Sequence, residues 1–293
     1  MRLSHIFLIS LVVLVWGLNF IAIKLGLSGF PPIFLCFLRM FFTCFPAIFF
    51  IKFPETSLRL VVLYGLFMFA LPFSLLFLSL HTGFTPGFAS LVLQMQTFFT
   101  VLLAIFLLGE RLNGRQIGAM LLSFSGIGIA GLNINGTSTL SGFFMLLGAA
   151  FCWGIGNLSA KKIGKVNILA LVIWGSLFTL PFLLSLSLLV EGSERILLSM
   201  KGLTFISAGS IAYIVYASTL FGYGVWSWML SRYRLPAIAP FTLMVPIIAL
   251  TSSALFTGEP IQSWKLCAAF LIITGLCINL SNSRTEISAS EPP

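Results

Sequence analysis

The chain contains no aspartate, and only 8% of its 293 residues are charged, although a soluble protein has about a quarter. Its seven glutamates fall in connections between apolar runs, near the ends of these runs or in the C-terminal tail. Proton or sodium coupling usually relies on a carboxylate near the middle of a membrane span, and the sequence offers none there. This leaves facilitated diffusion, exchange, or coupling through Glu110, Glu259 or His81 near the membrane surfaces. A P-loop motif is also absent, which excludes an ATPase site within this chain.

Catalytic side chains are scarce as well. His5 and His81 are the two histidines, and no Gly-x-Ser-x-Gly motif is present. An intramembrane enzyme, such as a lipid-modifying transferase, would need a nucleophile and a base, so we do not expect an enzyme. The cysteines fall inside apolar runs without metal-ligand spacing, which predicts small buried hydrophobes, no metal site and no cofactor. They are Cys36, Cys44, Cys152, Cys267 and Cys277.

Apolar residues dominate instead. The sequence is 59% hydrophobic, with 31 phenylalanines and a mean hydropathy of +1.10, which indicates an integral membrane protein. A helix needs about 20 apolar residues to cross a bilayer, and the runs predict an all-α polytopic protein with ten such helices. The first run contains Trp16 and lacks a cleavage site, so we expect it to be retained. The predicted spans are 6–27, 32–52, 58–80, 85–108, 113–133, 139–163, 167–190, 203–230, 235–257 and 263–282.

The net charge of +9 comes from Lys and Arg in short connections, so it indicates membrane orientation and no nucleic-acid partner. One side of the predicted bundle holds most of these residues, and that side is expected to be cytoplasmic, together with both termini. A multi-pass membrane protein follows. The basic set is Arg2, Lys52, Arg59, Arg111, Arg115, Lys161, Lys162, Lys165, Arg232, Arg234 and Arg284, against Lys24, Arg195, Lys201 and Lys265 on the other side.

The chain also contains an internal duplication. The segment Trp16–Lys24 returns in near copy at Trp153–Lys162, and Arg39–Pro46 matches Trp174–Pro181. We predict a first five-helix repeat over residues 1–137, a second over 138–283, and a disordered cytoplasmic tail over 284–293. Five helices is an odd number, so the second repeat crosses the membrane in the opposite sense, as in inverted-repeat secondary transporters. Further matches pair Tyr64, Gly109-Glu110, Gly126 and Ile129 with Tyr213, Gly258-Glu259, Gly275 and Ile278.

Several motifs carry a family resemblance from about Ile6 to Asn282. They are Trp16-Gly17-Leu18-Asn19-Phe20, Pro31-Pro32, Leu38-Arg39, Gly87–Gln94, Gly109-Glu110-Arg111-Leu112, Phe221–Trp226 and Ala239-Pro240. The chain resembles the EamA branch of the drug/metabolite transporter superfamily. This resemblance implies a ten-helix inner-membrane exporter of amino acids and related metabolites such as O-acetylserine and cysteine. Pro260 stands where a basic residue is expected, so the second Gly-Glu motif departs from the first.

Arg39 lies well inside the second predicted helix, where a charged side chain costs about 2.5–3.5 kcal/mol on insertion scales. Three interpretations are open: an internal structural contact, capture of a substrate carboxylate, or a side chain that reaches the membrane interface. The matching position in the second repeat is Trp174, so the repeats have diverged here.

The duplicated motif supplies four more candidate substrate-binding residues. Asn19 and Asn157 can donate and accept hydrogen bonds, which suits a zwitterion, although asparagine also joins helices in membrane bundles. Trp16 and Trp153 lie nearer the middle of their helices than interfacial anchors do, which favours cavity lining.

Helices four and eight carry the remaining candidates. Gln94 and Gln96 lie about 200 degrees apart around a helix, so one is expected to face the cavity and the other a neighbouring helix. Tyr213 and Tyr223 belong to an aromatic stripe that is either cavity wall or packing seam.

Pro72, Pro86, Pro240 and Pro246 are expected to interrupt helices three, four and nine, which indicates that helices three, four, eight and nine line a cavity. Gly126–Gly131 matches the dinucleotide fingerprint formally, but it lies in a transmembrane run without a preceding strand and is interpreted as helix packing.

The leading hypothesis is a secondary exporter of small amino-acid-like metabolites that works by alternating access. The alternative is an exporter of aromatic or drug-like compounds, for which cation–π contacts could serve, although Arg39 disfavours a cationic cargo. The partners expected are a small-molecule substrate and membrane lipid, with the protein as a monomer or a homodimer. The substrate-binding candidates are Trp16, Asn19, Arg39, Gln94, Trp153, Asn157, Tyr213 and Tyr223, which are expected to surround one midplane cavity.

Overall fold

The computed structural model describes residues 1–109, 113–133, 139–164, 166–233 and 235–289, without the side chains of 235, 236 and 282–289. Within these described ranges, ten helices are long and apolar enough to cross a membrane, which confirms the predicted number. Their bounds are Leu3–Gly26, Pro32–Phe49, Leu58–His81, Pro86–Leu108, Gly114–Leu132, Leu140–Ile163, Ile168–Val190, Phe205–Leu230, Ala239–Thr257 and Ser263–Ser281.

The first five spans form one repeat. The first, second and fifth spans are mainly single helices, whereas the third contains a π-helical turn and the fourth bends at Gln94-Met95. The elements are α1 (Leu3–Gly26), α2 (Pro32–Cys44), η1 (Ala47–Phe49), α3 (Leu58–Gly65), η2 (Leu66–Ala70), α4 (Leu71–His81), α5 (Pro86–Leu93), α6 (Gln96–Leu108) and α7 (Gly114–Leu132).

The second repeat follows the same order. Its third span again contains a π-helical segment, η3, in the place that η2 occupies in the first repeat. The elements are α8 (Leu140–Ile163), α9 (Ile168–Val190), α10 (Ser193–Lys201), α11 (Phe205–Ala212), η3 (Tyr213–Phe221), α12 (Gly222–Leu230), α13 (Leu235–Ile238), η4 (Ala239–Leu243), α14 (Met244–Thr257) and α15 (Ser263–Ala289).

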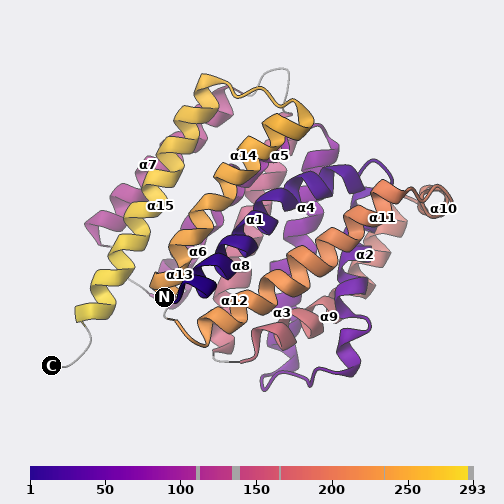
Figure 1. The fold of residues 1–293 in the computed structure, drawn as a ribbon, viewed down its shortest axis with the longest axis horizontal. Coiled ribbons are helices and arrows are strands. Elements are labelled where there is room, and N and C mark those ends of the chain that lie inside the picture. The colour runs from indigo at the N-terminus through magenta and orange to yellow at the C-terminus, as the bar shows by residue number, and fades with distance from the viewer. Residues whose placement is uncertain (110–112, 134–138, 165, 234, 290–293) are drawn as a thin grey trace.

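The two repeats exchange their first helices. Helix α1 packs against α14 and against α11, η3 and α12, whereas α8 packs against α4, η2, α5 and α6. Equivalent helices also pair across the repeats, namely α2 with α9, α5 with α14 and α7 with α15; the last pair forms one side of the bundle in Figure 1. This arrangement confirms an all-α fold built from two repeated halves.

The prolines break the helices in part as expected. Pro72 follows the π-helical turn η2, and Pro240 lies in the 3-10 segment η4 that precedes α14. The expectation was wrong for Pro86 and Pro246, because each lies in the first turn of a continuous helix, α5 or α14, where a missing N–H is tolerated. The fourth span bends directly after α5, at Gln94.

Small residues allow α7 and α15 to approach closely. A Cβ added at Gly126 would lie 3.0 Å from the carbonyl oxygen of Ala268, and one at Gly275 would lie 2.6 Å from the carbonyl oxygen of Ala119. Gly126, the first residue of the glycine-rich segment of α7, is therefore a packing contact with α15, as predicted.

Two cysteine expectations need correction. Cys36 and Cys44 are buried, but Cys267 and Cys277 are exposed on α15, because the outer surface of a membrane bundle faces lipid and an apolar side chain there needs no protein cover.

The helix α15 continues to Ala289, whereas the sequence predicts a tail from residue 284; no glycine or proline interrupts residues 284–289. The repeat boundaries stay predictions.

The two ends of the bundle differ in charge. We call the end that holds Lys52, Arg59, Arg115, Lys161, Lys162 and Arg232 the basic end. The other end, which holds Glu191, α10 and Glu259, we call the opposite end. Figure 1 shows α10 at the far side of the bundle from the N-terminus.

Candidate substrate-binding site

Arg39 lies inside the bundle and is 2% exposed. Its Nε and Nη2 donate hydrogen bonds to Oγ1 of Thr219, at 3.2 and 3.1 Å. The guanidinium carbon lies 3.8 Å from the centre of the Phe73 ring. Among the described residues, Nη1 has no hydrogen-bond partner. The guanidinium thus does not extend to the membrane interface, and one of its donor groups remains free.

The π-helical segment η3 provides the partners on the second repeat. Thr219 Oγ1 donates to the carbonyl oxygen of Ile214, five residues earlier, while it accepts from Arg39. The Trp16 Nε1 donates to the carbonyl oxygen of Ser218 at 3.0 Å. A π-helical turn widens the helix and frees backbone groups from their usual partners, and such turns are frequent at functional sites.

Gly222 permits this approach of Trp16. A Cβ at position 222 would lie 2.5 Å from Trp16 Nε1, closer than real contacts allow, so a larger residue would displace the indole.

Asn19 follows Trp16 by one helical turn on α1 and is 6% exposed. Its Oδ1 accepts no hydrogen bond from the described residues. Both α1 and α2 pack against η3, so Asn19 and Arg39 come from two helices that flank the same π-helical segment. A buried acceptor without a partner costs about 1–3 kcal/mol, which makes Asn19 a candidate ligand-binding residue.

A chain of aromatic rings joins both repeats around Arg39. The ring centroids are 5.8 Å apart for Trp16–Tyr223, 6.0 Å for Tyr223–Phe69, 6.4 Å for Phe69–Phe73 and 5.6 Å for Phe73–Trp153. The structure therefore brings together Trp16, Arg39, Tyr223 and Trp153 in one cluster. Phe73 and Thr219 are members that the sequence analysis did not single out.

The other predicted residues have different surroundings. Asn157 donates to Gln96 Oε1 at 2.6 Å and to Thr100 Oγ1 at 3.0 Å, so it joins α8 to α6. Tyr213 donates to the carbonyl oxygen of Val15 at 2.9 Å, which ties η3 to α1. Gln94 lies at the bend between α5 and α6 and is half-buried. These contacts bind helices to one another, and it is Gln96 that pairs with the duplicated asparagine.

Trp174, the repeat equivalent of Arg39, also has a structural contact. Its Nε1 donates to the carbonyl oxygen of Ile51 at 3.1 Å, and its ring lies 5.2 Å from that of Phe53. Where the first repeat has Arg39, the second repeat thus has a tryptophan that holds the connection between the second and third spans in place.

A cavity of about 1220 Å³ opens at the basic end. It extends from the connection between the second and third spans to Gly224, and none of the eight predicted substrate-binding residues is among the described residues that line it. Its lining comprises residues 50–55, 164, 166–170, 224, 227, 228, 230 and 231.

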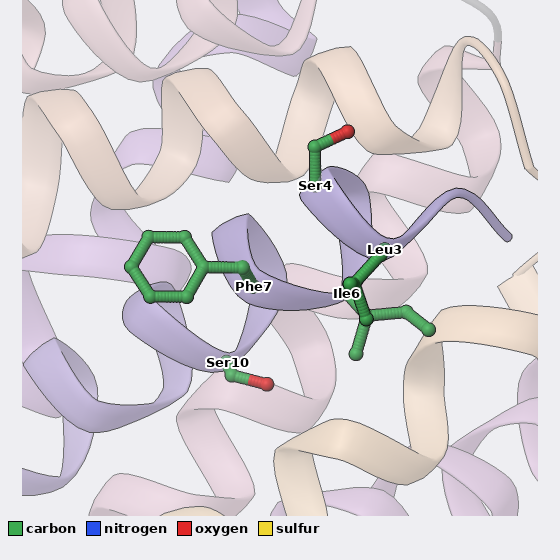
Figure 2. Close-up of a pocket in the computed structure, with 5 residues that line it drawn as sticks. All are labelled: Leu3, Ser4, Ile6, Phe7 and Ser10. Carbon is green, nitrogen blue, oxygen red and sulfur yellow. The ribbon is translucent and has the colours of Figure 1, made fainter.

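A second hollow, of about 510 Å³, is lined by Leu3, Ser4, Ile6, Phe7 and Ser10. Figure 2 shows that all five side chains come from the first turns of α1. Leu3 is 83% and Phe7 70% exposed, so this hollow belongs to the outer surface of the bundle.

Two halves of five helices that enclose a buried polar group between them have the architecture of a secondary transporter. Residues 3–132 and 140–281 each match the model of the EamA-like transporter family. The chain belongs to this family, which confirms the resemblance seen in the motifs.

Two relatives of similar length cover almost the whole chain. A probable amino-acid metabolite efflux pump of Salmonella typhimurium is 40% identical over 290 residues, with 97% of both chains covered. One with the same name from Escherichia coli is 39% identical, with 94% of both chains covered. A probable terminal-alkyne amino-acid exporter of Streptantibioticus cattleyicolor is 26% identical over 68% of this chain and 65% of the relative. A solved crystal structure shares the fold, with a TM-score of 0.62, 16% identity and coverage of 95% and 96%.

Proposed function

We propose that the protein exports small amino acids and related metabolites of the O-acetylserine and cysteine type across the inner membrane by alternating access. The observation that carries the proposal is the buried Arg39 with a free Nη1 donor between the two repeats. A buried cation with an unused donor group is costly unless an anionic partner arrives. A substrate carboxylate is such a partner, and Arg binds it in a fixed geometry.

The unpaired groups of Arg39 and Asn19 are complementary to an α-amino acid. The Nη1 of Arg39 needs an acceptor, which a carboxylate supplies, and the Oδ1 of Asn19 needs a donor, which an ammonium group supplies. The rings of Trp16 and Tyr223 offer apolar walls and cation–π contacts for the rest of the substrate. The names of the two enterobacterial relatives agree with this substrate class.

We further propose that export needs no imposed proton or sodium gradient. Glu259 follows the ninth span; burial raises the pKa of its carboxyl, but hydrogen bonds from Ser253 and Lys265 and the Lys265 charge outweigh this effect and place the pKa below its ordinary value. Such a carboxylate stays ionised near neutral pH and is a poor proton carrier. Transport by purified protein in liposomes, measured with and without each gradient, tests this. A strict need for either gradient would contradict it.

Two measurements test the substrate class. A strain that overproduces the protein is expected to release cysteine-pathway metabolites, and purified protein is expected to melt at a higher temperature with a small α-amino acid, since a ligand of the folded form raises apparent stability. The matched control is the amide of the same amino acid, which lacks the carboxylate. Resistance to dyes without release of amino acids would instead favour export of aromatic or drug-like compounds.

A further inference from the structure

Glu191 of the second repeat completes the N-terminus of a first-repeat helix. Its Oε1 accepts from the backbone N–H of Ile33 at 2.6 Å, and its Oε2 accepts from that of Phe34 at 3.0 Å. The Ser187 hydroxyl donates to Oε2 at 2.6 Å. Glu191 is 9% exposed. A carboxylate from the end of α9 therefore holds the first turn of α2 at the opposite end.

Glu259 makes the same kind of contact with α5. Its Oε2 accepts from the backbone N–H of Gly87 at 3.1 Å and from the Ser253 hydroxyl. Its Oε1 accepts from the ammonium group of Lys265 at 2.9 Å, and Lys265 is fully buried. A carboxylate that follows α14 thus holds the first turn of α5.

The helices α2 and α5 both begin without a side-chain cap of their own, so their first backbone N–H groups need an acceptor from another part of the chain. Each has proline in its first turn, and neither of the N-cap residues, Pro31 and Thr85, forms a side-chain capping bond. The first N–H groups of a helix need acceptors, and the helix dipole favours a negative charge there. Two carboxylates of the second repeat therefore replace the caps that the first-repeat helices lack.

Close packing surrounds both contacts. A Cβ at Gly87 would lie 2.9 Å from the Cα of Leu250, and one at Gly29, before α2, would lie 2.6 Å from the Cβ of Ser207. The large cavity lies at the basic end. The basic end thus holds an open cavity, although Trp174 and Ile51 still join the repeats there, whereas both carboxylate contacts and their close packing lie at the opposite end.

We propose that Glu191 and Glu259 form an outer latch, the pair of inter-repeat contacts that keeps the opposite end closed while the cavity at the basic end is open. This inference rests on the proposed transport function. Alternating access requires that the repeats separate at one end as they close at the other. Carboxylates and helix N–H groups can be rehydrated when they separate, since water replaces the lost hydrogen bonds. Contacts between a carboxylate and a helix N-terminus can therefore break and re-form more easily than a large apolar interface between the repeats.

Cysteine labelling tests the latch without a substrate. Cys36 is fully buried in α2, between Phe34 and Arg39, and serves as the sole cysteine once the other four are replaced by alanine. We expect Glu191→Gln to raise the labelling rate of Cys36 from the outside, by a membrane-impermeant maleimide, at least several-fold. A separate Ser227→Cys reporter in the cavity lining, without Cys36, is expected to label more slowly from the inside in the same variant.

The opposite responses of the two reporters separate a latch from a merely structural contact, because general loosening would raise both labelling rates and overturn the proposal. Unchanged labelling of Cys36 would overturn it too. The matched control is Glu194→Gln, an exposed glutamate of α10 at the same end, for which neither rate should change. If Glu191→Gln does not fold, Ser187→Ala decides, since it removes one bond to the carboxylate and should shift both reporters in the same directions by less.

The same pair of reporters in Glu259→Gln tests the second contact. Failure of the latch and failure of the proposed function are distinguishable. Latch variants that label like wild type in a protein that exports amino acids would reject the latch alone, whereas a shift of both reporters in a protein that exports none would reject the substrate class alone.

Discussion

The replacement Arg39→Lys separates substrate binding from structural support. Lysine keeps the positive charge but offers a single nitrogen where arginine offers a planar fork. In wild-type protein the fork donates twice to Thr219 and leaves Nη1 free. A lysine that reaches Thr219 has no second, fixed donor to aim at a substrate carboxylate.

The expected loss follows from the number of bonds. One hydrogen bond to a charged group contributes about 1.5–3 kcal/mol, which corresponds to a dissociation constant about 10- to 150-fold larger. The charge stays near the Phe73 ring and near Thr219, so we expect little change in the melting temperature. If Arg39 were only a structural support, the same loss would appear in the stability, and the affinity of the folded protein would stay near wild type.

The assay measures both quantities on one purified sample: the melting temperature without ligand and the dissociation constant for an amino acid. The control is Arg59→Lys, at an exposed arginine of the basic end. The amide of the amino acid adds a second test, because wild-type protein should prefer the acid and Arg39→Lys should lose most of that preference, as expected for two coupled groups. An unchanged affinity with a lower melting temperature would remove Arg39 from the binding site.

Three further predictions concern topology, the paired asparagines and pH. Cysteines introduced at Glu55 and Glu194, exposed residues of equivalent connections, should label from opposite sides of the membrane; labelling from the same side would refute the inverted repeat. Asn19→Ala should weaken ligand binding with little loss of stability, whereas Asn157→Ala should cost about 1–3 kcal/mol of stability and leave the affinity near wild type. Because folding lowers the Glu259 pKa below 4.5, its contribution to stability is complete above that pH and is lost as the pH falls further. The melting-temperature difference between wild type and Glu259→Gln should therefore shrink below pH 4.5, and a constant difference would contradict this.

The sequence was sufficient to predict the spans and the duplication, because a bilayer imposes a minimum length on apolar runs and the Trp16–Lys24 motif returns at Trp153–Lys162. It also predicted that Arg39 needs a partner. The partner itself could not be predicted, since Thr219 is 180 residues away and meets Arg39 only where η3 widens. No periodicity marks that position.

The latch carboxylates show a different limit. The sequence places Glu191 and Glu259 at helix ends, where a carboxylate is ordinarily solvated, so it predicts no contact of either carboxylate with another helix. The available indication lay in the helices that they complete, because Pro31-Pro32 begins a helix without a side chain able to accept from its first N–H groups. Such a helix requires an acceptor from elsewhere in the chain.

The duplication explains why the two asparagines differ. An inverted repeat generates two equivalent positions for each polar residue, but a single substrate between the repeats uses a given group only once. Asn157 has protein partners in Gln96 and Thr100, so its burial has no unmet cost. The Oδ1 acceptor of Asn19 and the Nη1 donor of Arg39 are buried and have no hydrogen-bond partner among the described residues. These two residues lie on α1 and α2, the helices that flank η3. Unmet hydrogen-bonding groups of opposite kind persist in a bundle when a ligand completes them, and this asymmetry locates the proposed binding site on the Arg39 side.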